Sequence, residues 1–109
     1  MYHRVRIPEA DTHLLRFLWF HGSDPEGEVR VWKMTCHVFG AVSSGSVASF
    51  ALRCCAEEGR SLFPEAADAL IRKSYVDDVL CATDSVKGAV KLASDLNELC
   101  STGAFNMSK

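Results

Sequence analysis

Two adjacent aspartates, Asp77 and Asp78, stand in the middle of an otherwise apolar segment, residues 74–81. On one flat strand, neighbouring side chains point to opposite faces, so the two carboxylates would diverge. At the tip of a hairpin the backbone turns, and both carboxylates can approach one point in space. We therefore expect a tight antiparallel hairpin here, with the two aspartates at its tip.

This aspartate pair is the strongest candidate site in the sequence. Two anions held together beside apolar strands cost free energy unless a cation is present. Mg²⁺ is the matching ion, because it prefers oxygen ligands and is usually held by one or two carboxylates together with substrate phosphates. The alternative interpretation is a solvated turn in which Asp77 and Asp78 have no chemical role.

The first half of the chain predicts strands followed by a helix. Residues 2–7 alternate with period two and indicate a strand. Residues 14–20 and 29–34 flank a loop rich in Gly, Pro and Asp, and predict a hairpin. One of three serines is expected to begin a helix that runs to Gly59, namely Ser43, Ser44 or Ser46.

The second half predicts two further helices around the aspartate hairpin. One begins at Pro64, and the other begins after Ser85 and ends at Gly103. Residues 104–107 then resemble the start of a last strand. Helices separated by antiparallel hairpins predict an α+β layered domain, not alternating βαβ units.

Composition narrows the class of protein. The chain has 109 residues, enough for one domain or part of one, and a formal net charge of -2, which does not favour a self-sufficient nucleic-acid binder. The five cysteines lack the spacing of a metal site and indicate a reducing compartment. No signal peptide or membrane span is visible, so we expect a cytoplasmic or nuclear protein.

The order of the motifs resembles one enzyme family. Residues 75–78, Tyr-Val-Asp-Asp, are similar to the catalytic box of reverse transcriptases, the RNA-directed DNA polymerases. The residues within these motifs are most similar to those of the BEL/Pao group of long-terminal-repeat retrotransposons. The likeness covers residues 1–109. Four other segments match in family order: 1–7, 32–35, 39–44 and 103–109.

The resemblance implies a truncated antiparallel palm sheet with packed helices, a nucleotidyltransferase site and roles for individual residues. Asp77 would be a direct ligand of two catalytic Mg²⁺ ions, and Asp78 would support the site by charge or hydrogen bonding. Tyr75 and Val76 would lie near the primer terminus. The partners of the complete domain would be a primed RNA or DNA template and a deoxynucleoside triphosphate.

Other residues are implied in substrate binding. Tyr2 matches the aromatic that excludes a ribose 2′-hydroxyl, with a buried aromatic on a strand as its alternative. Phe39 and Gly40 would lie beside the incoming nucleotide, although a tight turn explains Gly40 equally well. Lys109 loosely matches a lysine near the nucleotide phosphates, and a terminal charge is its alternative. Gly45 and Ser74 depart from the group, which has a proline and an aromatic at these positions.

An essential carboxylate of the family would precede Met1, five residues before Tyr2, and is missing from this chain. The expectation is therefore a palm fragment, truncated at both ends, that is inactive alone although the complete domain would polymerise DNA. The alternative is a non-catalytic remnant that binds a partner or self-associates through an unfinished sheet edge. A third possibility is an unrelated α+β protein with a structural Asp-Asp turn.

Overall fold

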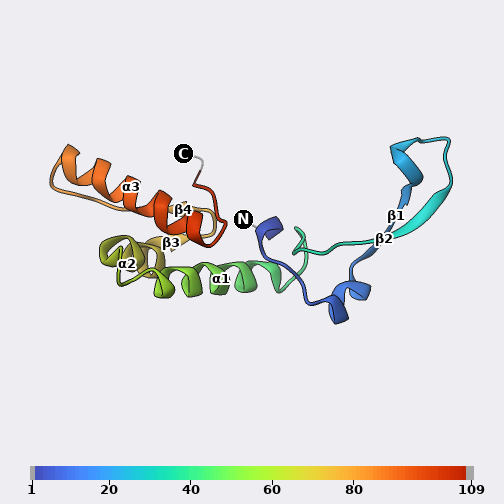
Figure 1. The fold of residues 1–109 in the computed structure, drawn as a ribbon, viewed down its shortest axis with the longest axis horizontal. Coiled ribbons are helices and arrows are strands. Elements are labelled where there is room, and N and C mark those ends of the chain that lie inside the picture. Colours follow the sequence, from blue (N-terminus) through green and yellow to red (C-terminus); the bar gives the residue numbers. More distant parts are fainter. Residues whose placement is uncertain (1, 108–109) are drawn as a thin grey trace.

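The computed structural model describes residues 2–107, except for the side chain of Ser23. Its helices and strands follow one another along the chain as shown in Figure 1. In order, they are η1 (Tyr2–Arg4), η2 (Glu9–Leu14), β1 (Arg16–Phe20), η3 (His21–Ser23), β2 (Val29–Lys33), α1 (Ser44–Glu58), α2 (Pro64–Lys73), β3 (Ser74–Tyr75), β4 (Asp78–Val79) and α3 (Val86–Thr102).

The hydrophobic core lies between α1, α2 and α3. Its largest fully buried side chains are Leu70 of α2 and Leu99 and Cys100 of α3. Small residues let the helices approach closely, since Ala66, Ala67 and Ala69 of α2 are also buried. The core is therefore built from residues 52–105, with Val5 packing against it from the N-terminal segment.

The three predicted helices are confirmed. Pro64 occupies the first turn of α2, where its missing N–H leaves no hydrogen bond unmade. Ser85 is the N-cap of α3, and its Oγ accepts a hydrogen bond from the Gly88 N–H at 3.1 Å. Ser43 precedes α1 without a capping hydrogen bond from its side chain.

We expected Gly103 alone to end α3, but Gly103 and Ala104 together form the end of the helix. Gly103 is the C-cap with ordinary φ (−88°), and Ala104 takes the left-handed φ of 59°. The Phe105 N–H donates to Cys100 O at 2.9 Å and the Ala104 N–H donates to Ser101 O at 3.0 Å, which is the Schellman arrangement. Gly103 is needed for space, because a Cβ there would lie 2.5 Å from Cys55 Sγ.

We predict that Ala104→Gly raises the free energy of unfolding by about 1 kcal/mol, because a left-handed φ is unfavourable for a residue with a Cβ. Gly103→Ala should lower it by about 1–3 kcal/mol through overpacking against Cys55. Urea denaturation followed by circular dichroism measures both changes. Equal effects of the two substitutions would contradict this assignment of the cap.

Burial also changes the acidity of one core thiol, that of Cys100. Burial raises the pKa of Cys100 to about 11, from an ordinary value of 9.0. The neutral thiol is favoured in the fold, so its contribution to stability is complete below pH 9 and is lost as the pH rises toward 11. Cys54 and Cys81 are also free cysteines, and both are exposed.

We therefore expect the free energy of unfolding to fall by up to about 2–3 kcal/mol between pH 9 and pH 11. In this range the thiol ionises in the unfolded chain but stays neutral in the folded one. Denaturation at several pH values measures this slope. Cys100→Ala should be less stable at neutral pH and should show a shallower slope. An unchanged slope in that variant would contradict the role of Cys100.

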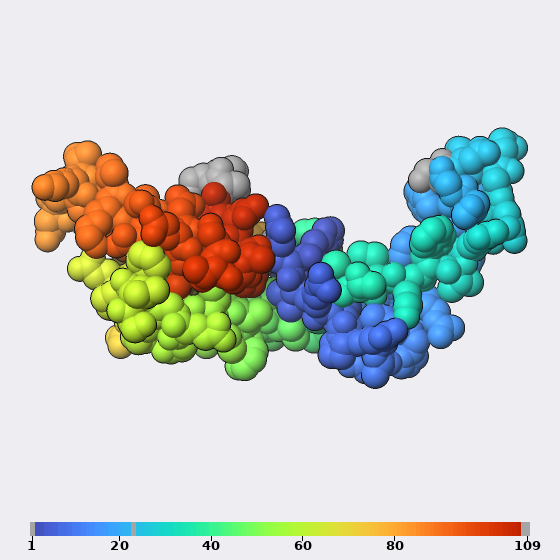
Figure 2. Space-filling view, in the orientation of Figure 1, coloured from blue at the N-terminus to red at the C-terminus, as the bar shows by residue number. Residues whose placement is uncertain are grey.

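The strands form two separate antiparallel pairs. β1 pairs with β2 over five residues, from Arg16 opposite Lys33 to Phe20 opposite Val29, and β3 pairs with β4. The first pair projects from the helical body as an arm (Figures 1 and 2). We call residues 16–33 the aromatic arm. The arm gives the chain a radius of gyration of 17.8 Å, against about 13 Å for a compact chain of this length.

Both hairpins and the mixed α+β class are thus confirmed, whereas two predicted strands are wrong. Residues 2–4 form the 3₁₀ turn η1, and Arg6 makes only an isolated bridge to Cys36. Residues 104–107 are not a strand, because the left-handed Ala104 turns the chain so that Phe105 enters the core. The described residues consequently contain two small sheets instead of one continuous sheet. None of their helices has the length and apolar character needed to cross a membrane.

Candidate functional site at the aspartate hairpin

The aspartate hairpin continues directly from the end of α2. Ser74 Oγ donates a hydrogen bond to Leu70 O at 2.6 Å, and the Leu80 N–H donates to Lys73 O at 3.1 Å. Tyr75 pairs with Asp78, so Val76 and Asp77 form a two-residue loop. The expectation that both aspartates stand at the tip is therefore wrong for Asp78, which lies on β4. The last turn of α2, which begins at the buried Leu70, therefore fixes the direction of the tip.

Val76 has a strained backbone at the tip of this hairpin. Its φ is 54°, in the left-handed region that β-branched residues rarely adopt. A positive φ at the first loop residue alone is the pattern of a type II′ turn, which prefers glycine there. Strain of this kind costs of order 1–3 kcal/mol, and it is concentrated at functional sites in proteins.

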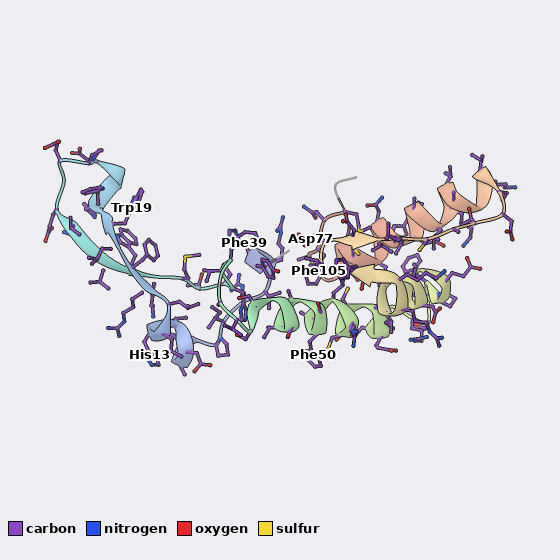
Figure 3. All side chains as sticks on the ribbon, turned by 180° about the vertical axis from the view of Figure 1, so that it is seen from behind. His13, Trp19, Phe39, Phe50, Asp77 and Phe105 are labelled. Carbon is purple, nitrogen blue, oxygen red and sulfur yellow. The ribbon has the colours of Figure 1, made fainter. Side chains whose placement is uncertain are left out.

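Asp77 and Asp78 line a cavity of about 510 Å³ between the hairpin, the core and the C-terminal segment. Figure 3 shows Asp77 on the hairpin in the neighbourhood of Phe105. Arg4 of η1 is the one cation among the residues that line this cavity. The four ion pairs among residues 2–107 all lie elsewhere, so both carboxylates are free to accept a ligand from solvent.

The two carboxylates suit a metal ion only in part. Mg²⁺ is commonly held by one or two carboxylates plus substrate phosphates and water, which Asp77 and Asp78 could satisfy. Among residues 2–107, however, no group of three or more His, Cys, Asp or Glu side chains comes together. The described residues thus offer ligands for one ion bound together with its substrate, and further ligands would be needed for two.

A second groove, of about 590 Å³, lies on the other side of Val76. Tyr2 lines it together with residues from the first turns of α1, including Gly45, Phe50 and Arg53. Val76 lines both hollows, so the strained tip of the hairpin separates the aspartates from Tyr2. The structure therefore brings Tyr2, Val76 and the two aspartates to one region, although they are up to 76 positions apart in sequence.

The predicted binding residues near α1 surround Tyr2. The Phe39 ring meets the Tyr2 ring edge-on, with centroids 4.8 Å apart, and Phe39 remains mostly exposed. Gly40 has a φ of 87° and no atom within 4 Å of the position of a Cβ. Within this chain, Gly40 is therefore required for its turn, and no neighbouring backbone approaches it closely. Tyr75 lies beyond this group, with 76% of its surface exposed.

Several residues of the site were missed by the sequence analysis. Arg4 was not among the predicted site residues, and Tyr2 and Arg4, both on η1, line different hollows. Ser74 was noted only as a departure from the group, whereas its hydroxyl ties the hairpin to α2. Asn106 and Met107 also line the aspartate cavity. The predicted Lys109 and the matched Met1 lie outside the described residues.

Comparison of the chain with protein-family models, with curated proteins and with solved structures finds no match.

We predict that Val76→Gly raises the free energy of unfolding by about 1 kcal/mol, because glycine adopts the positive φ without a Cβ clash. Val76→Ala is the matched control, since it shortens the side chain but retains the Cβ. Thermal and urea denaturation measure both variants. If Val76→Ala raised the free energy of unfolding as much as Val76→Gly, the valine side chain, and not the positive φ of the backbone, would be the cause of the strain.

Proposed function

We propose that this chain is part of the palm of an RNA-directed DNA polymerase of the BEL/Pao retrotransposon type, a nucleotidyltransferase that extends a primer on an RNA or DNA template. The observation that carries the proposal is the strained Val76 turn, which holds Asp77 and Asp78 at a cavity and adjoins the groove lined by Tyr2. The ordered resemblance of the motifs supports it independently. We locate this activity in the cytoplasm or nucleus.

In this proposal each residue has a role that follows from its position. Asp77 binds magnesium directly, and Asp78 adds negative charge from the neighbouring position on the hairpin. Bound Mg²⁺ would supply electrostatic stabilisation of the attacking and leaving oxygens during phosphoryl transfer. Arg4, in the same cavity, can attract nucleotide phosphates, while Tyr75 and Val76 face the primer end.

The groove on the other side of Val76 would then receive the nucleotide sugar and base. Tyr2 is held by its edge-on contact with Phe39, which limits the space available beside the sugar. Gly40, which follows Phe39, takes a positive φ of 87° at the turn beside this aromatic pair. This arrangement would orient a nucleotide by shape, and Arg53 is the charged residue of the groove lining.

The second candidate function is that of a non-catalytic, palm-like remnant, which only binds a partner or a second copy of itself. The observation that favours it is the number of carboxylates, because the described residues bring no third ligand to Asp77 and Asp78. By this argument the chain alone binds magnesium weakly and is inactive, and polymerisation belongs to a complete domain that supplies another carboxylate.

Metal binding by this chain distinguishes a magnesium site from a solvated turn. We expect substoichiometric Mn²⁺, used as a paramagnetic probe that accepts the same oxygen ligands, to broaden the amide NMR signals of residues 75–79. A deoxynucleoside triphosphate should strengthen the effect. Asp77→Asn should weaken Mn²⁺ binding by roughly tenfold or more without changing the circular dichroism spectrum.

Asp84→Asn is the matched control, because Asp84 is an exposed carboxylate outside the hairpin and its cavity. Broadening that is equal around Asp84 and Asp77 would indicate non-specific binding and would contradict a magnesium site. In a complete polymerase domain, Asp77→Asn should abolish primer extension. Normal extension by that folded variant would overturn the assignment to polymerases.

A further inference from the structure

The aromatic arm has apolar side chains on both of its faces. Opposite residues of an antiparallel pair share a face, so Phe17 and Trp32 lie together on one face, and Leu18 and Val31 on the other. Leu18 is 66% exposed and Val31 is 64% exposed. A two-stranded hairpin is marginally stable alone in water, so the arm gains most from additional pairing. Figure 3 shows Trp19 on this arm, remote from Asp77.

The hydrogen-bond pattern shows which backbone groups of β1 face outward. The His21 N–H donates to Glu28 O, and the Met34 N–H donates to Leu15 O, both at 2.9 Å. Since hydrogen-bonded pairs recur at every second residue, the odd-numbered residues of β1 bond to β2. The N–H and C=O groups of Arg16, Leu18 and Phe20 therefore point away from β2, and within residues 2–107 this pair has no third strand.

The two edges of the arm differ in their protection. β2 carries Arg30 and Lys33, and charged side chains on an edge oppose pairing with another strand. β1, with the sequence Arg-Phe-Leu-Trp-Phe, has a single charge at its first residue and no proline or glycine. The β1 edge is therefore the one that is open to another strand.

We propose that β1 pairs with β1 of a second copy of this chain, antiparallel about a two-fold axis at Leu18. The three outward-facing residues then match, with Leu18 opposite Leu18 of the second copy and Arg16 opposite its Phe20. The two Arg16 side chains lie at opposite ends of the contact, whereas a parallel arrangement would place like charges together. Charge thus selects the antiparallel two-fold pairing.

This pairing joins the exposed side chains of the two arms. On one face, Leu18 of one copy meets Leu18 of the other at the new contact, whereas each Val31 lies one strand further out, on β2, and does not meet the other copy. On the other face, Phe17 of each copy lies opposite Trp19 of the second copy, and aromatic cross-strand pairs stabilise sheets. Both apolar surfaces that each chain leaves exposed are extended by the same contact.

The contact is small, because one edge of five residues buries less than the roughly 800 Å² per partner of a standard interface. We therefore expect a dissociation constant on the order of 10–100 µM. This inference does not depend on the polymerase assignment, because it uses no residue of the aspartate hairpin.

Sedimentation velocity of the full chain at increasing concentration tests the proposal. The wild type should pass from monomer to dimer, and Leu18→Lys should remain monomeric at tenfold higher concentration, because two ammonium groups would meet at the two-fold axis. Leu18→Glu should behave in the same way. Mixing the L18K and L18E chains should restore a dimer, since opposite charges then face each other.

Val31→Lys is the matched control, because Val31 shares the face and the exposure of Leu18 but lies on β2. The dissociation constant of the V31K dimer should lie within about threefold of the wild-type value. A wild type that stays monomeric at several hundred micromolar would overturn the proposal. So would an equal loss in V31K and L18K, or a mixture of L18K and L18E that forms no heterodimer. Circular dichroism confirms that each variant retains its helices.

Discussion

The burial of Leu70 connects the stability of this chain to its candidate site. Leu70 is inaccessible in the core that α2 forms with α1 and α3, and burial of a leucine side chain contributes about 1.5–3 kcal/mol. The carbonyl group of the same residue accepts the hydrogen bond from Ser74. The end of α2 cannot shift without moving the hairpin, so the aspartates are fixed by the same packing that holds the helices together.

Local sequence signals predicted the elements that local interactions determine. Pro64, Ser85 and the residues around the arm's loop fixed the starts of helices and the pairing of β1 with β2. The failure at residues 2–7 involves pairing over a long distance in sequence. Residues 2–7 alternate as a strand does, but they form only an isolated bridge at Arg6, through backbone hydrogen bonds of Val5 and Ile7, and residues 2–4 turn into η1.

The site was predictable in its chemistry and not in its shape. Two adjacent aspartates in an apolar segment indicated the hairpin, and the structure contains it. The position of Arg4 beside them depends on the turn at η1, and no pattern in the sequence showed that turn. Likewise, the strain at Val76 follows from the two-residue length of the loop, which became definite only with the register of β3 and β4. Whether these groups act on a nucleotide stays a prediction.

The separation of the aromatic arm from the helical core has a consequence during protein synthesis. The arm leaves the ribosome first, and about seventy further residues must be added before α3 is complete. At typical translation rates this interval is on the order of 4–15 s. Because the arm projects from the helical core, its hairpin can form and expose its open edge throughout this interval, which makes it a natural target for chaperones that bind nascent chains.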